Sequence, residues 1–195
     1  MPPRRKQDHH GRRARREGYP ARSVYKLQEI DRRVGLFKKG QRVLDLGASP
    51  GSWTLYAAER VGPTGRVLGI DLEASEVALP PHAEIRALDA FEADAQSLGG
   101  PFDLVISDMA PKTSGQRHAD QYRSYELVMR ALDLVKAVLA PGGAFVAKIF
   151  QGAEFEDARD ALRAVFDKVR VIRPEATRDE SYEVFLVGLG FRPSI

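Results

Sequence analysis

The stretch VLDLGASPGSW, residues 43–53, passes from an apolar run into a glycine-rich turn and then into helical spacing. Its first four residues are typical of a buried parallel strand, and Gly47, Pro50 and Gly51 predict a tight turn before a helix at about 52–60. Open α/β sheets bind ligands at such strand ends, where small residues let the backbone approach. We therefore expect a binding crevice beside this turn, although glycines also occur where a chain only needs to bend.

Three successive strand ends carry an aspartate, at Asp45, Asp71 and Asp89. The turn after the first of them is neither an NTP-binding GxxxxGK[ST] loop nor a clean GxGxxG loop. Asp71 follows Gly51 by 20 residues, where a carboxylate commonly accepts hydrogen bonds from ribose hydroxyls. Asp89 would accept a hydrogen bond from an adenine amino group. One such aspartate is often a helix N-cap, but three of them beside a glycine turn favour a nucleoside pocket.

Strands and helices alternate along the chain. A first helix has Ser23 as its expected N-cap and places Leu27, Ile30 and Val34 on one face. Further strands are expected near 42–47, 66–71, 83–88, 102–107, 143–149, 168–173 and 183–189, and further helices near 52–60, 91–98, 121–139 and 154–166. This alternation predicts an α/β fold with a parallel, doubly wound sheet and right-handed crossovers. The last two strands are joined too closely for a helical crossover, so we expect them to pair antiparallel at one edge.

Composition excludes several classes of protein. The 195 residues suit one domain, and the absence of cysteine rules out disulfides, thiolate metal sites and cysteine nucleophiles and is consistent with a cytoplasmic location. None of the four histidines pairs at a metal-ligand spacing, so no metal site is expected. No run of 18 apolar residues occurs and the N-terminus is basic, so neither a membrane span nor a signal peptide is expected.

Charge is distributed unevenly. Residues 1–42 carry a net charge of +10, and residues 43–195 carry −7. The run Arg12-Arg13-Ala14-Arg15-Arg16 is typical of a segment that binds nucleic-acid phosphates, although a solvated tail that aids solubility has the same composition. We predict a flexible basic arm over residues 1–20, followed by a single domain over residues 21–195.

Four charged residues stand at unusual places. Asp108 ends the apolar strand that begins at Phe102, and Lys148 interrupts the apolar run 144–150. A lysine in a buried strand is costly unless it lines a cleft or has partners, and the alternative is a snorkelling lysine on an edge strand. Glu183 at the start of the last strand and Lys26 on the first helix are unremarkable when each is taken alone.

Together these segments resemble the FtsJ-like (RrmJ-type) ribosomal RNA 2′-O-methyltransferases. The likeness rests on ARSVYKL (21–27), DLGASPGSW (45–53), SDMAP (107–111), LAPGG (139–143), KIFQG (148–152) and SYEV (181–184). Ser49, Ser52 and Lys112 depart from the family's usual residues. The resemblance implies a Rossmann-like methyltransferase fold, with a mostly parallel seven-stranded sheet, an antiparallel last strand and helices on both faces.

The resemblance also implies roles for particular residues. It indicates a catalytic tetrad of Lys26, Asp108, Lys148 and Glu183, and S-adenosylmethionine contacts from Gly51, Trp53, Asp71, Asp89 and Asp108; the glycine turn adds Gly47 and Asp45. The implied reaction methylates the ribose 2′-hydroxyl of a uridine in the A loop of 23S rRNA, within the large (50S) ribosomal subunit. Lys148 would be the general base or would orient the hydroxyl.

Two alternatives remain open at this stage. The tetrad does not discriminate between RNA substrates, so one of them is a 2′-O-methyltransferase acting on another RNA, such as tRNA or an mRNA cap. The other is a non-catalytic rRNA-binding factor for ribosome assembly that keeps the fold. Nothing in the surface pattern demands a dimer, and we expect a monomer.

Overall fold

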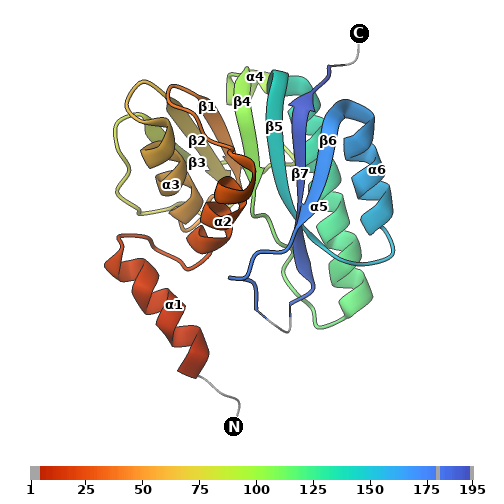
Figure 1. Cartoon of the computed structure of the whole chain (residues 1–195), viewed down its shortest axis with the longest axis horizontal. Coiled ribbons are helices and arrows are strands. Elements are labelled where there is room, and N and C mark those ends of the chain that lie inside the picture. The colour runs from red at the N-terminus through yellow and green to blue at the C-terminus, as the bar shows by residue number, and fades with distance from the viewer. Residues whose placement is uncertain (1–4, 179–180, 194–195) are drawn as a thin grey trace.

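The computed structural model describes residues 5–178 and 181–193 of the chain. A seven-stranded sheet in the order β3-β2-β1-β4-β5-β7-β6 forms its centre (Figure 1). The strands are β1 (Arg42–Leu46), β2 (Arg66–Asp71), β3 (Ala83–Ala87), β4 (Phe102–Ser107), β5 (Leu139–Phe150), β6 (Phe166–Ile172) and β7 (Glu183–Phe191). The helices are α1 (Arg5–Arg16), α2 (Val24–Val34), α3 (Ser52–Val61), α4 (Ala95–Leu98), α5 (Arg117–Val138) and α6 (Phe155–Val165).

The pairing of the strands confirms the predicted topology. Strands β1 to β5 pair parallel, whereas β7 runs antiparallel to both β5 and β6. The described residues of the connection from β6 to β7 form no helix, and β7 pairs directly beside the strand that precedes it. Strand β5 lies between β4 and β7, so Lys148 is on an interior strand and the alternative of an edge-strand lysine does not hold.

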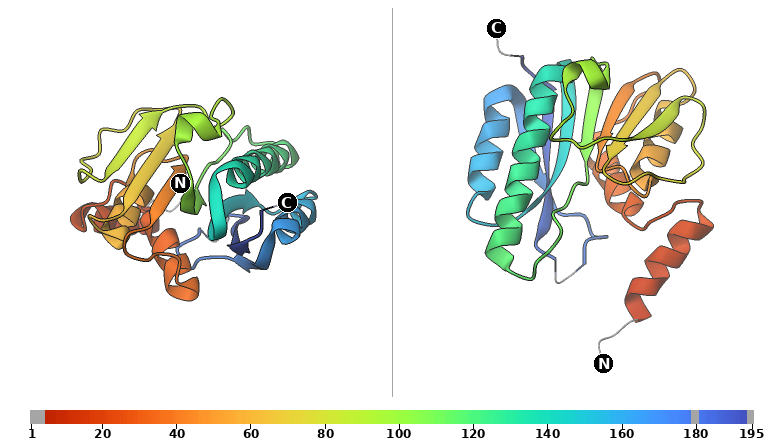
Figure 2. Two further views of the ribbon diagram at one scale, coloured as in Figure 1. Left: turned by 90° about the horizontal axis from the view of Figure 1, so that it is seen from above. Right: turned by 180° about the vertical axis from the view of Figure 1, so that it is seen from behind.

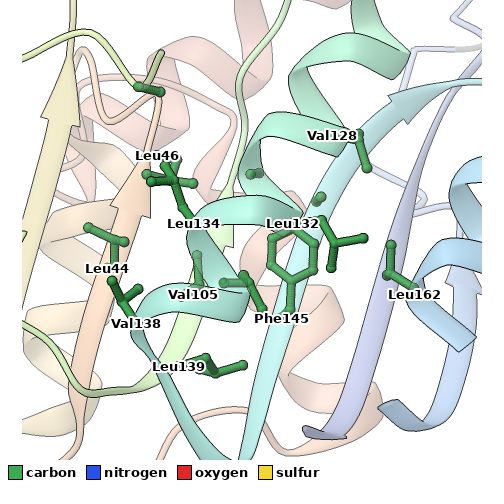
Figure 3. Close-up of a cluster of buried hydrophobic side chains, with 14 of the residues drawn as sticks. Leu44, Leu46, Val105, Val128, Leu132, Leu134, Val138, Leu139, Phe145 and Leu162 are labelled. Carbon is green, nitrogen blue, oxygen red and sulfur yellow. The ribbon is translucent and has the colours of Figure 1, made fainter. Parts of the chain in front are cut away.

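Helices cover both faces of the sheet, as predicted (Figure 2). Helices α2 and α3 pack on one face through a buried cluster that includes Leu27, Ile30 and Trp53. Helices α4, α5 and α6 cover the other face, where Phe145 of β5 and Leu132 of α5 meet in a larger buried cluster (Figure 3). The apolar side chains of α5 are therefore buried against the sheet.

Some boundaries differ from the sequence prediction. Helix α4 begins at Ala95 rather than near residue 91, because the side chain of Asp94 accepts a hydrogen bond from the Ser97 backbone and caps the helix there. Ser23 precedes α2 as expected, but its side chain makes no capping hydrogen bond. Strand β5 starts at Leu139, directly after α5, which is earlier than the strand expected near 143–149, and Pro141 lies inside it.

The basic N-terminal segment also differs from its prediction. Where the sequence predicts an unstructured arm, residues Arg5–Arg16 form helix α1, which projects from the body of the protein (Figures 1 and 2). Ala14 is buried against Tyr19 and Val24, and an ion pair at 2.7 Å joins Arg13 to Glu17 one turn later. These contacts stabilise helix α1.

The part of the chain that the structure describes holds neither a membrane-spanning helix nor a cluster of metal ligands. No helix in residues 5–178 and 181–193 is both long and apolar enough to cross a bilayer. Within the same ranges, no three histidine or carboxylate side chains are grouped to hold a metal ion.

Candidate active site

A cavity of about 520 Å³ opens at the carboxyl ends of the central strands. Strand β1 pairs with β2 on one side and with β4 on the other, so the strand order reverses at this point. Such a switch point is the favoured ligand site of an open α/β sheet. Four of the residues singled out from the sequence line the cavity, namely Gly47, Asp71, Asp89 and Asp108.

The other lining residues had no site role predicted from the sequence. They are mostly apolar and comprise Ser49, Ile70, Leu72, Leu88, Ala90, Phe91, Met109, Ala110 and Leu127. Leu72 and Phe91 are 69% and 55% exposed, which is unusual for such large apolar side chains. Leu72 follows Asp71 by one position, and Phe91 follows Asp89 by two. This placement just after a strand-end aspartate is the sequence signal that could have identified them as cavity residues.

The glycine turn approaches the cavity closely. Gly47 has φ +77°, and a Cβ atom there would lie 2.8 Å from Cγ of Met109. Glycine is therefore required at this position by both backbone conformation and space. Gly51 has φ +106°, and a Cβ there would crowd Val77 and lie 3.3 Å from Oγ of Ser75. Gly51 thus lets the 75–77 loop pack on the turn, and it does not line the cavity.

Asp71 and Asp89 hold the backbone at the rim of the cavity in place. Asp71 accepts hydrogen bonds from the backbone N–H of Ser49 at 3.0 Å and of Glu73 at 2.9 Å. These bonds tie the turn after β1 to the end of β2. Asp89 accepts a hydrogen bond from the backbone N–H of Phe91 at 2.9 Å, which holds that ring at the rim.

Asp45 and Trp53 lie behind the cavity wall rather than on it. Asp45 is fully buried and accepts a hydrogen bond from the Thr54 hydroxyl at 2.7 Å. Trp53 is 3% exposed, donates from its indole N–H to the Ser23 carbonyl at 2.9 Å and packs against Phe185. The structure therefore gives both residues a packing position, and no direct contact with a ligand follows from it.

Burial raises the pKa of Asp45 to about 7, against the hydrogen bond from Thr54, which lowers it. The carboxylates of Asp108 and Asp71 raise this pKa further. The native protein consequently holds the Asp45 proton more tightly than the unfolded chain. The stability contributed by that proton is fully present below pH 4 and is lost as pH rises through about 7.

Asp45→Asn is therefore expected to flatten the dependence of stability on pH. The free energy of unfolding of the wild type should fall by about 2–3 kcal/mol more than that of the variant between pH 5 and pH 8. Urea unfolding at both pH values, without added ligand, measures this difference. Asp133→Asn, on the exposed side of α5, is the matched control, and parallel pH profiles for Asp45→Asn and the wild type would contradict the prediction.

The four charged residues form two ion pairs. Nζ of Lys148 lies 3.0 Å from Oδ1 of Asp108 and donates to the Asp108 backbone carbonyl at 2.7 Å. Lys26 of α2 forms an ion pair with Glu183 of β7. All four side chains are largely buried, and Lys148 is only 7% exposed. Buried charges of this kind require partners, and here each lysine has a carboxylate.

Strand register brings the two pairs together. Phe150 of β5 pairs with Glu183 of β7, and Lys148 pairs with Phe185. Alternate residues of a strand share a face, so Lys148 and Glu183 are diagonal neighbours on one face of the sheet. Asp108 also lines the cavity, which joins this charged cluster to the cavity's edge. The sequence alone shows no such proximity, because the four residues are spread over 158 positions.

A second, smaller cavity adjoins the Lys26–Glu183 pair. Its volume is about 280 Å³, and it is lined by Ala21, Arg22, Ser23, Lys26, Arg178, Ser181 and Glu183. Two arginines thus lie beside the charged cluster. Ser181 belongs to the SYEV segment (181–184) but had no predicted role, and Arg178 has no signal of its own in the sequence.

Known proteins share this fold and these segments. The sequence pattern of the FtsJ-like methyltransferase family matches residues 19–191. A protein of Sorangium cellulosum named ribosomal RNA large subunit methyltransferase E is 57% identical over 178 residues, which cover 90% of this chain and 84% of the relative. A protein of the same name from Oleidesulfovibrio alaskensis is 50% identical over 190 residues, covering 95% of this chain and 92% of the relative.

A solved structure from Plasmodium falciparum shares the fold. It superposes with a TM-score of 0.78 at 24% identity and covers 90% of this chain and 100% of its own. The family match spans most of the chain, and the two bacterial relatives align along almost its whole length. The protein described here, with its charged cluster at the edge of a switch-point cavity, therefore belongs to the FtsJ-like methyltransferase family.

Proposed function

We propose that this protein transfers a methyl group from S-adenosylmethionine to the ribose 2′-hydroxyl of a uridine in the A loop of 23S rRNA. The observation that carries the proposal is the buried Lys148–Asp108 pair, which joins the cavity to the Lys26–Glu183 pair. The names of the two bacterial relatives support large-subunit ribosomal RNA as the substrate. That substrate implies a cytoplasmic location, and one chain supplies all four charged side chains, which suits a monomer.

The switch-point cavity fits S-adenosylmethionine in size and chemistry. Its volume of about 520 Å³ falls within the roughly 300–1,000 Å³ of small-molecule pockets. The Asp71 carboxylate suits ribose hydroxyls, Asp89 suits the adenine amino group, and the exposed ring of Phe91 suits the adenine face. The Asp108 carboxylate suits a cationic sulfonium. When bound, S-adenosylmethionine supplies an electrophilic methyl group at that sulfonium.

Lys148 is placed to handle the proton of the attacking hydroxyl. A neutral lysine amine has two N–H donors and one lone pair. The backbone carbonyl and the carboxylate of Asp108 lie within hydrogen-bond reach of Nζ and would accept both donors. The lone pair then remains for the ribose hydroxyl proton, and proton transfer by such a positioned group contributes about 10²–10⁴-fold to rate.

The other charged residues position the reactants. Asp108 holds the Lys148 amine through two of its atoms and faces the cavity at the same time. Lys26 and Glu183 would hold the ribose and balance the charge of the cluster. Alignment of the attacking oxygen with the methyl carbon and the sulfur would supply much of the remaining rate enhancement.

Methyl transfer from tritiated S-adenosylmethionine tests the proposal. Large ribosomal subunits, naked 23S rRNA and tRNA are offered in parallel, and the label is mapped to base or ribose. We expect ribose label on the large subunit or its rRNA. Label on tRNA alone would show that tRNA, not large-subunit rRNA, is the substrate. If no RNA is labelled while the protein still binds the methyl donor, the protein is better explained as an rRNA-binding assembly factor.

Helix α1 is proposed to contact RNA phosphates. His9, Arg12, Arg15 and Arg16 line a shallow cavity along it, and Arg15 and Arg16 are exposed. Neutralising Arg15 and Arg16 with glutamine keeps a good helix former and leaves the Ala14 contact in place. The slope of log affinity for rRNA against log salt should then become shallower by about 1.4, because two phosphate contacts are lost.

Affinity for rRNA at several salt concentrations measures this slope. The matched control neutralises Lys168 and Arg170, two exposed cations of β6, with glutamine. The affinity for S-adenosylmethionine should stay constant in both double variants. Equal slopes for the α1 variant and the wild type would reject the contact.

A further inference from the structure

The smaller cavity beside Lys26 and Glu183 gathers positive charge. Arg22 enters it from the segment before α2, and Arg178 enters it from the connection between β6 and β7. Within residues 5–178 and 181–193, neither guanidinium forms an ion pair with a carboxylate. Among the described residues that line the cavity, Glu183 is the one carboxylate, and it forms an ion pair with Lys26.

Arg22 and Arg178 lie close enough for their positive charges to repel each other. Burial lowers the pKa of Arg22, and the neighbouring charge of Arg178 lowers it further, with Glu183 acting in the opposite direction. Arg22 also donates to the Ala176 carbonyl at 3.4 Å, which attaches it to the loop that carries Arg178. Arg22 is half-buried and Arg178 is exposed, and Glu183 is the one carboxylate that lines the cavity with them among the described residues. Two guanidinium groups in this setting form a favourable site for an anion.

We propose that this cavity binds the phosphodiester next to the methylated ribose. Arg22 and Arg178 would donate to its free oxygens, and the hydroxyls of Ser23 and Ser181 complete the lining. Guanidinium forks match the geometry of phosphate oxygens and form charge-assisted hydrogen bonds with them. The cavity's 280 Å³ is below the roughly 300–1,000 Å³ of drug-sized ligand sites and suits a phosphate group. The assignment rests on the methyl transfer to RNA proposed above.

The position of the cavity fits this role. Lys26 and Glu183 belong both to the cavity lining and to the charged cluster that contains Lys148. In RNA, the 2′-oxygen and the 3′-phosphorus of one nucleotide are linked through only C2′, C3′ and O3′. A 3′-phosphate held between Arg22 and Arg178 therefore leaves its own 2′-hydroxyl beside the charged cluster. Both arginines act as positioning residues, since they hold the nucleotide without touching the reacting atoms.

A coupled substitution of protein and RNA tests the site. The probe is a fluorescent RNA hairpin of the A loop, with a neutral methylphosphonate at the linkage 3′ of the target uridine. Neutralising the linkage should weaken binding to the wild type by about 10–100-fold, the range for hydrogen bonds to charged groups. Arg178→Ala should bind the natural hairpin more weakly than the wild type does, by a similar factor. Changing the probe to the methylphosphonate hairpin should then weaken binding to Arg178→Ala only a little further. Arg170→Ala, an exposed arginine of β6, should behave as the wild type.

Kinetics add a readout that a structural role would not change in the same way. Arg178→Ala should raise KM for RNA more than it lowers kcat, with unchanged affinity for S-adenosylmethionine, and Arg178→Lys should recover part of the loss. Equal sensitivity of Arg178→Ala and the wild type to the methylphosphonate would overturn the assignment.

Inorganic phosphate separates this proposal from the proposed reaction. Titration of the free protein with phosphate should shift the Nε resonances of Arg22 and Arg178 saturably, and it should not shift that of Arg170. Unshifted resonances in a protein that methylates rRNA would refute the phosphate site alone. Shifted resonances in a protein that methylates no RNA would refute the proposed function and, with it, the assignment of the anion to RNA.

Discussion

Replacing Lys148 with alanine is expected to lower kcat for methyl transfer by about 10²–10⁴-fold. The substitution removes the amine that is proposed to take the hydroxyl proton and leaves the Asp108 carboxylate without its buried partner. Lys148→Arg separates two roles, because an arginine keeps the positive charge and does not lose a proton. If Lys148 is the base, both variants lose activity, whereas a purely orienting lysine lets the arginine variant keep part of it.

Single-turnover assays with saturating RNA measure this loss directly. The affinities for S-adenosylmethionine and rRNA and the melting temperature should be measured for each variant, since Lys148 is buried. Lys168→Ala, an exposed lysine of β6, is the control and should keep wild-type turnover. Turnover near that of the wild type in Lys148→Ala, with RNA binding intact, would remove Lys148 from the mechanism.

Replacing Phe145 with alanine is expected to lower the free energy of unfolding by about 3–5 kcal/mol. Phe145 is fully buried and stacks with Phe166, with 6.3 Å between the centroids of the two rings. It extends from β5 towards α5, where it lies near Leu132 (Figure 3). Truncation would leave a cavity between the sheet and two of its helices, and the rigid surroundings would fill only part of it.

Thermal unfolding should show a decrease in Tm of roughly 6–20 °C for Phe145→Ala, given the usual scaling for a chain of this size. Val171→Ala is the comparison, because Val171 lies on edge strand β6 and is 42% exposed. That change should stay within about 0.5 kcal/mol of the wild type. A loss below 1 kcal/mol for Phe145→Ala would contradict the packing described here.

Local sequence patterns were sufficient for the sheet and for much of the site. Apolar runs between turn residues marked the strands, and the short connection before Glu183 indicated the antiparallel last strand. A carboxylate at the end of an apolar run and a lysine inside one pointed to Asp108 and Lys148. Each inference depended on interactions within one element or between neighbours in the chain. Such local interactions leave a recognisable periodic pattern in the sequence.

Boundaries and partners needed more than local patterns. Composition predicted an unstructured N-terminal segment, yet Ala14 finds Tyr19 and Val24 to pack against and helix α1 forms. Trp53 and Asp45 have the sequence positions of ligand contacts, but helix α3 and strand β1 bury them behind the cavity wall. Burial of a particular side chain depends on the elements packed over it, and those elements lie far away in the sequence.

The sequence by itself determined the class of fold, the order of its elements and the unusual places of Asp108 and Lys148, whereas Lys26 and Glu183 were indicated only by the resemblance to a known family. It did so because hydrophobic periodicity and turn chemistry act over short stretches of chain. Only the tertiary structure decided which of these residues meet. The β5–β7 register placed Lys148 beside Glu183, and the β6–β7 connection carried Arg178 to Arg22. Such contacts join residues more than 30 and 150 positions apart, and the packing of the sheet against its helices fixes their geometry.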